Sequence, residues 1–329
     1  MTEGVKMSKP ILEVKNLQTG FQLENNIVVP VDGVSFQVKE GETLALVGES
    51  GCGKSVTSLS IMRLLAQPAG RILDGQILFQ DRDLARCSEK EMQEIRGNTI
   101  AMIFQEPMTS LNPLMRIGDQ IEEELLLHKA LSKKQAQKRV LELLELVEIP
   151  TAKTRLKQYP HELSGGMRQR VMIAMALACN PKLLIADEPT TALDVTIQAQ
   201  ILDLLNRLQK ELKMSIMMIT HDLGVVAEVA DHVLVMYAGT VVEYGTVHEI
   251  FQAPQHPYTK GLLRSLPNLE EDEQELYIIP GTVPNLAKLH QGCRFAPRCD
   301  SVCDACWLAE PNGYEKNNHF VRCLKDNEK

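Results

Sequence analysis

A glycine-rich segment ending in a lysine and a hydroxyl residue directly follows the apolar run of residues 44–47. It fits the pattern G-x-x-x-x-G-K-[ST] at every fixed position and reads Gly48-Glu49-Ser50-Gly51-Cys52-Gly53-Lys54-Ser55. A strand that enters such a turn and leaves it as a helix directs backbone N–H groups and the positive end of the helix dipole at one point, where phosphate oxygens bind. Lys54 can reach the β- and γ-phosphates, and Ser55 can bind Mg²⁺ through its hydroxyl. The segment therefore predicts a site for a nucleoside triphosphate with Mg²⁺.

Two adjacent carboxylates, Asp187 and Glu188, end the apolar run of residues 183–186. An aspartate at the end of a strand beside a nucleotide can hold Mg²⁺ directly or through water. The following glutamate can orient and polarise the water that attacks the γ-phosphate, because phosphoryl transfer depends mainly on alignment and electrostatics. An acidic strand end by itself is more often a solvated turn, so this interpretation depends on the phosphate-binding segment.

A second glycine-rich segment, Ser164-Gly165-Gly166-Met167, lies just before Arg168-Gln169-Arg170 and an apolar helical pattern. Ser164 can cap that helix, and the two glycines allow the backbone to approach a phosphate closely. The segment predicts a second anion site at a helix N-terminus, too far along the chain to duplicate the first.

Gln105 and His221 each stand at the end of a predicted strand. In that position Gln105 could sense Mg²⁺ and the attacking water, and His221 could contact the γ-phosphate. Either residue alone is more often an ordinary hydrogen-bonded polar residue. The hypothesis therefore depends on all of these motifs occurring together.

The elements that must position these groups follow from the apolar periodicity. Residues 11–47 read as antiparallel strands that lead into the phosphate-binding segment and its helix. Residues 108–175 change to helical periodicity, which predicts a helical subdomain inserted into an α/β core. The remaining predicted elements are strands at residues 76–79, 100–104, 183–187, 215–220, 233–236 and 240–243, and helices at 196–212 and 223–230. Strands that alternate with helices favour a parallel or mixed sheet covered by helices.

The order of these motifs resembles the ATP-binding subunit of ABC transporters, over residues 11 to about 250. The motifs are the phosphate-binding segment, Gln105, Leu163-Ser164-Gly165-Gly166-Met167, Asp187-Glu188, Ala192-Leu193-Asp194 and His221. The resemblance implies an α/β fold, the P-loop NTPase cassette of ABC proteins, with a mixed sheet core, an antiparallel β-subdomain and an inserted helical subdomain. Met167 departs from the family, in which many members carry glutamine there.

The resemblance also implies a role for each matching residue. Phe21 would stack on adenine, Gly48 to Ser55 would form the Walker A loop with Val56 following it, and Gln105 would be the Q-loop glutamine. Ser164, Gly165 and Gly166 would belong to the signature, Asp187 and Glu188 would be the Walker B pair, Asp194 the D-loop residue and His221 the switch histidine. Catalysis would fall to Glu188, Gln105 and His221, and Mg²⁺ to Ser55, Gln105 and Asp187.

In this family two subunits pack head to tail, and each ATP lies between the Walker A loop of one and the signature of the other. The resemblance therefore implies a transport-coupled ATPase whose bound ATP favours closure of the pair. Hydrolysis removes that favourable contact and reopens the pair.

Three segments are similar to the dipeptide and oligopeptide (and nickel) importer branch, and within it to the D-type subunit. They are residues 104–113, 163–170 and 256–263. This similarity implies peptide import, a second ATPase subunit in a heterodimer, two transmembrane permease subunits and, indirectly, an extracytoplasmic substrate-binding protein. A nickel or other small-solute importer of the branch stays open, because other subunits select the substrate. A soluble ABC ATPase without a transport role is the less favoured alternative, since the chain has neither a second cassette nor a long coiled-coil insertion.

Composition limits the remaining classes of function. The 329 residues are 44% hydrophobic and 24% charged, as is ordinary for a globular protein, and the net charge is −8. This charge argues against a dominant nucleic-acid surface, and no apolar stretch has the length of a membrane helix. The first residues do not read as a secretory signal. We expect a peripheral protein on the cytoplasmic face of the cell (inner) membrane, with an ATP-binding domain over residues 1–254.

Residues 255–329 are predicted to form a C-terminal extension, reached through a proline-rich, acidic linker. Five of the eight cysteines lie there, and Cys293, Cys299, Cys306 and Cys323 could close a tetrahedral thiolate site. Such a site suits Zn²⁺ or an iron–sulfur cluster, and Cys303 could replace a neighbouring ligand. Similarity to the D-type subunits, some of which carry a [4Fe–4S] cluster, favours iron–sulfur over zinc, and the absence of a metal, or disulfide bonds, stays open as a further alternative. Because few apolar residues surround the cysteines, we expect the extension to need the metal in order to fold.

Overall fold

The computed structural model describes residues 9–24, 26–105, 110–191, 193–266 and 277–324. Their contacts form two compact units. The first unit contains residues up to 11, residues 39–42 and residues 86–219. The second contains residues 12–38, 43–85 and 220 onward. Within the described ranges, no helix is both long and apolar enough to cross a bilayer.

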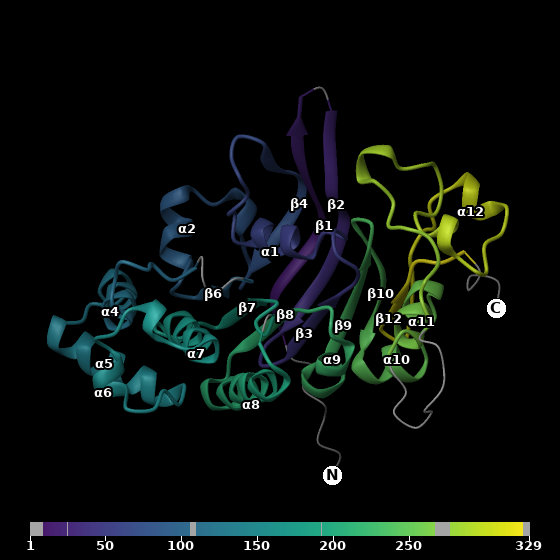
Figure 1. The fold of residues 1–329 in the computed structure, drawn as a ribbon. Helices are drawn as coiled ribbons and strands as arrows, with labels where there is room; N and C mark the ends of the chain where they lie inside the picture. The colour runs from purple at the N-terminus through teal and green to yellow at the C-terminus, as the bar shows by residue number, and fades with distance from the viewer. Residues whose placement is uncertain (1–8, 25, 106–109, 192, 267–276, 325–329) are drawn as a thin grey trace, which may run out of the picture. The chain divides into compact units, whose positions relative to one another are not determined.

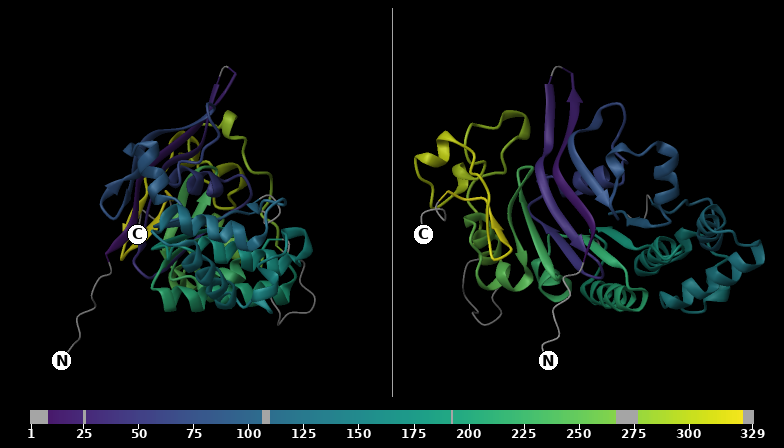
Figure 2. Two further views of the ribbon diagram at one scale, coloured as in Figure 1. Left: turned by 90° about the vertical axis from the view of Figure 1, so that its left-hand side faces the viewer. Right: turned by 180° about the vertical axis from the view of Figure 1, so that it is seen from behind.

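A four-stranded sheet of order β2-β1-β4-β5 forms one part of the second unit. Its strands are β1 (Pro10–Leu23), β2 (Asn26–Lys39), β4 (Gly70–Phe79) and β5 (Arg82–Asp83). The strand β1 pairs antiparallel with β4, so the predicted antiparallel β-subdomain is confirmed. In Figure 2, β1 and β2 run as two long neighbouring purple strands. Buried and exposed residues alternate from Val34 to Val38 of β2, as expected of a sheet with one covered face.

Five further strands of the second unit form a continuous run in the order β11-β12-β10-β9-β3. They are β3 (Thr43–Val47), β9 (His232–Tyr237), β10 (Thr240–Thr246), β11 (Tyr314–Lys316) and β12 (His319–Val321). Because β3 is parallel to β9 and the other pairs are antiparallel, the sheet is mixed, as predicted. The helices of this unit are α1 (Lys54–Ile61), α9 (Leu223–Val229), α10 (Val247–Gln252), α11 (Pro257–Arg264) and α12 (Ala305–Leu308).

The first unit is built on three parallel strands, β6 (Ile100–Ile103), β7 (Leu183–Asp187) and β8 (Ser215–Ile219). Every residue of β7 and β8 is buried, as in parallel strands covered on both faces. The helices are α2 (Glu89–Ile95), α4 (Ile117–His128), α5 (Lys133–Leu146), α6 (Ala152–Arg155), α7 (Gly165–Ala176) and α8 (Val195–Leu212). Figure 1 shows α4, α5, α6 and α7 gathered together, in agreement with a helical subdomain.

Local sequence explains where these helices begin. Ser132 caps α5 and Gln135 returns the bond to the Ser132 backbone, which forms a capping box. The long helix α8 buries Ile201, Leu205 and Leu208 at spacings of three and four, so one stripe faces the core.

The C-terminal extension differs from its prediction in two respects. The linker expected beyond about residue 255 is wrong for residues 257–264, which form α11, with Pro257 at the start of the helix, where it needs no N–H partner. The extension also contributes more apolar packing than expected, because Tyr258, Ile279 and Phe295 are buried in one core cluster with Tyr237. Outside the described residues lie the acidic run 270–273, residues 106–109 with the predicted start of the helical subdomain, and Ala192.

Candidate nucleotide-binding and hydrolysis site

The glycines of the phosphate-binding segment adopt backbone conformations that other residues rarely take, and two of them leave no space for a side chain. The φ angles of Gly48, Gly51 and Gly53 are +146°, +80° and +106°, in the region that favours glycine. A Cβ at Gly48 would lie 2.2 Å from the carbonyl oxygen of Met236, and one at Gly53 would lie 2.2 Å from that of Pro30. The segment therefore forms a tight turn from the buried strand β3 into α1, as the pattern predicted.

Lys54 is folded over this turn. Its side chain is 6% exposed, and its Nζ donates to the carbonyl oxygens of Gly48 at 2.7 Å and Glu49 at 3.1 Å. The Sγ of Cys52 lies 3.8 Å from the same Nζ, and burial raises the pKa of that thiol despite the nearby ammonium. The lysine charge is thus held at the mouth of the turn, where phosphate oxygens would approach.

Groups from elsewhere in the second unit support the turn. The carbonyl of Cys52 accepts a hydrogen bond from Gly239 N at 3.0 Å, and Glu49 N donates to the Tyr258 hydroxyl at 2.8 Å. The Glu49 carboxylate accepts two bonds from Arg298, at 2.6 and 3.0 Å. Sequence reasoning missed both Tyr258 and Arg298. A signal for Tyr258 existed in the 256–263 segment, whereas nothing around Arg298 marked it.

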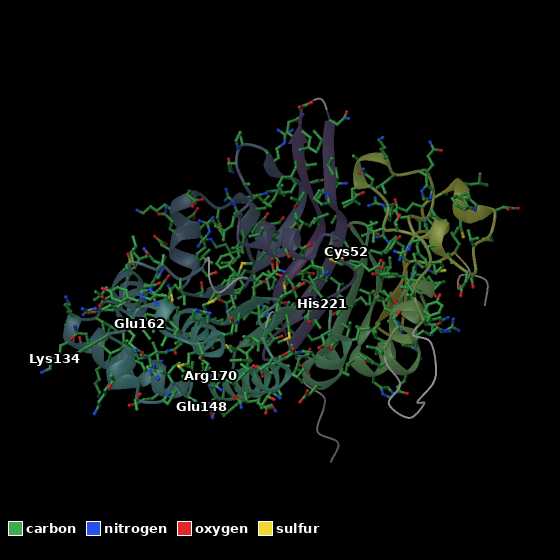
Figure 3. The ribbon with its side chains drawn as sticks, in the orientation of Figure 1. Cys52, Lys134, Glu148, Glu162, Arg170 and His221 are labelled. Carbon is green, nitrogen blue, oxygen red and sulfur yellow. The ribbon has the colours of Figure 1, made fainter. Side chains whose placement is uncertain are left out.

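Phe21 and His221 belong to the same unit as the phosphate-binding turn. Phe21 lies opposite Gly70 in the β1–β4 pair, and a Cβ at Gly70 would come within 2.8 Å of its ring. Thr220 N donates to Leu46 O at 3.2 Å, so the backbone just before His221 lies beside the end of β3. His221 and Cys52 are both labelled in Figure 3. The adenine and γ-phosphate contacts assigned to these residues stay predictions.

In the first unit, Glu188 is held at the end of β7 by several groups. Gln105 Nε2 donates to its Oε2 at 3.0 Å, and Thr191 Oγ1 donates to the same oxygen at 2.8 Å. The backbone of Glu188 has φ +47°, a shape rare for glutamate, and its N–H donates to Ile219 O at 2.9 Å. The structure thus brings together Gln105 and Glu188, which were each predicted to act on the attacking water, and adds Thr191, which sequence reasoning missed. Asp187, directly before, is 5% exposed.

The signature segment forms the start of α7. Ser164 Oγ accepts from Met167 N at 3.4 Å, so the predicted cap is present. Gly166 is crowded, since a Cβ there would lie 2.8 Å from Ile197 Cγ2. Ile197 N in turn donates to Asp194 Oδ1 at 3.0 Å, which makes Asp194 the cap of α8. The signature glycines and the predicted D-loop residue therefore meet at the starts of two neighbouring helices.

Arg170 fixes the first part of α7 within the first unit. Its Nη1 donates to Val147 O at 2.8 Å and to Glu148 at 3.1 Å, and Arg207 donates to the other Glu148 oxygen at 2.8 Å. Burial raises the pKa of Glu148, but the hydrogen bonds from the two arginines outweigh it and lower the pKa. Figure 3 shows Glu148 and Arg170 next to each other, below α7 and near α8. The position of the signature helix is therefore tied to the end of α5 and to α8.

The predicted Mg²⁺ ligands are divided between the units. Ser55 belongs to the second unit, whereas Gln105 and Asp187 belong to the first. Their hydroxyl, amide and carboxylate oxygens are the donor types that Mg²⁺ takes. A common site for the three stays a prediction.

The predicted cysteine ligands lie near one another in the extension. Burial, together with smaller effects of the charges of Cys306, Cys299 and Cys323, raises the pKa of Cys293 to about 11. Cys303 Sγ lies 3.3 Å from Cys306 Sγ. Even so, among the described residues no three or more His, Cys, Asp or Glu side chains are arranged to hold a metal ion. The four thiols are neighbours, but they are not placed as a finished ligand set.

The phosphate-binding turn, the glutamate held by glutamine at a strand end and the serine-capped glycine helix define an ATP-binding cassette of the ABC class. Comparison with known families gives the same class: the profile described as "ABC transporter" matches residues 31–191. The profile described as "Oligopeptide/dipeptide transporter, C-terminal region" matches residues 242–306. The chain belongs to the family of ATP-binding proteins of oligopeptide and dipeptide ABC transporters.

Individual relatives agree with this assignment over almost the whole chain. The oligopeptide transport ATP-binding protein AppD of Bacillus subtilis is 55% identical over 315 residues, which cover 95% of this chain and 96% of AppD. OppD of the same organism is 57% identical over 314 residues, covering 95% of this chain and 88% of OppD. Among solved structures, the dimeric ATP-binding cassette MJ0796 in a post-hydrolysis state with ADP and Pi is 29% identical, with a TM-score of 0.64. That match covers 72% of this chain and 98% of MJ0796.

Proposed function

We propose that this chain hydrolyses ATP to drive the import of dipeptides or oligopeptides, with ATP bound at an interface with a second ATPase subunit. The carboxylate of Glu188 carries the catalytic part of the proposal, because Gln105 and Thr191 hold it in one orientation at the end of β7. The similarity to AppD and OppD, named for oligopeptide transport, supports the peptide part. A nickel or other small-solute importer of the same branch is the second candidate, on the same similarity.

Each group of the site has a distinct task in this proposal. Lys54 exchanges its two carbonyl bonds for oxygens of the β- and γ-phosphates, so its charge stays in place while its partners change. Glu188 orients the attacking water and polarises it, and Gln105 keeps the carboxylate turned toward that water. Ser55, Asp187 and Gln105 would hold Mg²⁺, which would supply positive charge to offset that of the phosphates. His221 contacts the γ-phosphate from the end of β8.

The assembly follows from the need for two phosphate sites. The turn at residues 48–55 binds one ATP, and the capped helix at Ser164 completes the ATP site of the partner. The dimeric state of MJ0796 supports such a pair. We propose a heterodimer with a second ATPase subunit, on two transmembrane permeases that receive peptide from an extracytoplasmic binding protein. The chain would then be peripheral, on the cytoplasmic face of the membrane.

Replacing the catalytic carboxylate tests the hydrolysis step. Glu188→Gln keeps the size and one acceptor of the side chain but cannot act as a base, so we expect ATP binding near wild type and turnover reduced by at least about a hundredfold. The matched control is Glu142→Gln, which changes an exposed glutamate of α5 in the same unit. Both variants are assayed for phosphate release and for binding of a fluorescent ATP analogue. Undiminished hydrolysis by Glu188→Gln contradicts the assignment.

Co-purification with uptake tests the transport part. A detergent extract of cells that express the tagged chain should yield two permeases and a second ATPase subunit together with it. The complex in vesicles should then accumulate labelled dipeptide or oligopeptide with ATP. Accumulation of nickel without peptide would instead select the second candidate, and recovery of the chain without permeases would contradict a transport role.

We propose further that Cys293, Cys299, Cys306 and Cys323 hold a [4Fe–4S] cluster, with Zn²⁺ as the alternative. The charges of the neighbouring cysteines raise the pKa of Cys293, so forming four thiolates together is costly. A bound cation would offset this cost, which supports the proposal. Protein purified without oxygen should be brown and contain iron and sulfide in equal amounts. Colourless protein that contains zinc selects the alternative, and protein with neither contradicts both.

A further inference from the structure

The C-terminal extension contacts the second residue of the phosphate-binding turn with two side chains. Arg298 Nη1 donates to Glu49 Oε2 at 2.6 Å and its Nη2 donates to Oε1 at 3.0 Å, so the two planar groups pair through both oxygens. The buried Tyr258 hydroxyl accepts from Glu49 N at 2.8 Å. The carboxylate and the backbone of Glu49 are therefore both fixed by the extension.

Arg298 is itself firmly placed. Only 6% of it is exposed, its Nε donates to Pro280 O at 2.9 Å, and its Nη2 also reaches Ile279 O at 3.3 Å. Its guanidinium lies 5.8 Å from the centre of the Tyr237 ring. Because these contacts already fix the Arg298 side chain, it loses little further conformational entropy when it pairs with the carboxylate. The position of Arg298 therefore determines that of the Glu49 side chain.

Glu49 also determines the shape of the turn. Its carbonyl oxygen accepts from Cys52 N at 3.3 Å and from Lys54 Nζ at 3.1 Å. A displacement of Glu49 would therefore move the backbone of the turn and the lysine that meets the phosphates. A second arginine of the extension, Arg294, donates to Ala238 O at 2.7 Å in the β9–β10 turn. The N–H of the next residue, Gly239, donates to the Cys52 carbonyl of the phosphate-binding turn.

We propose that Arg298 is a positioning residue for ATP binding: through Glu49, the C-terminal extension holds the phosphate-binding turn in the shape that accepts the nucleotide. Arg298 touches no reacting group and acts on affinity, not on the chemical step. Cys299 directly follows Arg298 in the chain and Cys293 directly precedes Arg294, so a rearrangement of the backbone around these cysteines would act on the turn through the two arginines.

The test measures MgATP binding by the full-length chain and KM and kcat of the transporter complex. Arg298→Met should weaken MgATP binding and raise KM about tenfold while kcat changes less than about twofold. Arg298→Lys keeps the charge without the planar fork and should recover part of the affinity. Arg264→Gln is the matched control, since its contact with Asp300 is long and exposed, and it should bind MgATP as wild type does.

A double-mutant cycle shows whether Arg298 acts through Glu49. In a Glu49→Ala background the additional change Arg298→Met should alter MgATP affinity less than about twofold. Thermal unfolding of each variant identifies any that fails to fold, and Arg298→Lys and Glu49→Ala remain informative in that case. Wild-type affinity in Arg298→Met overturns the proposal. So does an equal loss of affinity with and without Glu49, since Arg298 would then act only on the fold of the extension.

Discussion

His256 is the residue whose environment most clearly predicts a pH dependence. It is 2% exposed, and its Nδ1 accepts from Tyr258 N at 3.1 Å at the start of α11. Burial lowers its pKa from 6.5 to about 4; Glu243 opposes this shift and Lys260 adds to it. The imidazole is therefore neutral at pH 7, which the cap requires, because a protonated Nδ1 cannot accept a hydrogen bond.

The sign and size of the effect follow from these two pKa values. The unfolded chain takes up the proton at about pH 6.5 and the folded chain only near pH 4, so acid favours the unfolded state. The stabilisation is complete above pH 6.5 and is lost as the pH falls toward 4. Linkage gives a loss of about 2 kcal/mol between pH 8 and pH 5, and about 3.4 kcal/mol in total below pH 4.

His256→Asn isolates the contribution of this imidazole to the pH dependence of the unfolding free energy, because the asparagine oxygen can still cap α11 but does not titrate. Urea unfolding is followed by the fluorescence of Trp307, the only tryptophan, which lies in the extension. Wild type should lose about 2 kcal/mol more than the variant between pH 8 and pH 5. The Glu243–His319 pair behaves oppositely, since hydrogen bonding to Glu243 raises the pKa of His319, but it is common to both proteins and cancels. Equal losses in the two proteins would refute the reasoning.

Three substitutions test the positioning of the two phosphate sites. Gly53→Ala forces a Cβ to within 2.2 Å of Pro30 O at φ +106°, so it should cost at least about 2 kcal/mol of unfolding free energy and abolish binding of a fluorescent ATP analogue. A melting curve and binding isotherm identical to wild type would contradict this steric argument. Arg170→Met removes the bonds to Val147 and Glu148 and should cost about 1–2 kcal/mol in urea unfolding, whereas Arg139→Met, which removes a more exposed arginine of α5, should cost less. Asp194→Ala removes the cap of α8 and should cost about 1 kcal/mol by the same measurement, while Asp194→Asn, which keeps an acceptor, should cost only a few tenths. Equal losses in the last two variants would exclude a capping role.

Short-range signals allowed much of the cassette to be predicted from sequence. The strand expected at residues 183–187 has those bounds, because five consecutive residues that are buried on both faces give an apolar run with a sharp end. Ser164 was expected to cap a helix and does so, since a serine before two glycines and an apolar helix leaves few other roles. Gln105 and Glu188 meet because each follows one of two neighbouring parallel strands.

The extension resisted prediction because its structure depends on distant partners. The residues of α11 contain a proline and a glycine and read as a linker, yet Tyr258 is fully buried against Tyr237 and Phe295. Similarly, β12 has only three residues and exists because β10 offers it an edge. Neither segment carries a periodic pattern long enough to be recognised alone.

The pair of Glu49 and Arg298 shows most clearly why contacts of the extension could not be predicted from the sequence. The two residues are 249 positions apart, and each belongs to a type that is usually solvated on the surface. An arginine that is almost fully buried must have its charge and its N–H groups matched, and Glu49, Pro280 and Ile279 supply that match. The phosphate pattern leaves position 49 unspecified, so its side chain was free to take on a task outside nucleotide contact. In this chain that task is to receive the C-terminal extension, and a residue that the pattern leaves unspecified is therefore the one through which the extension can act on ATP binding.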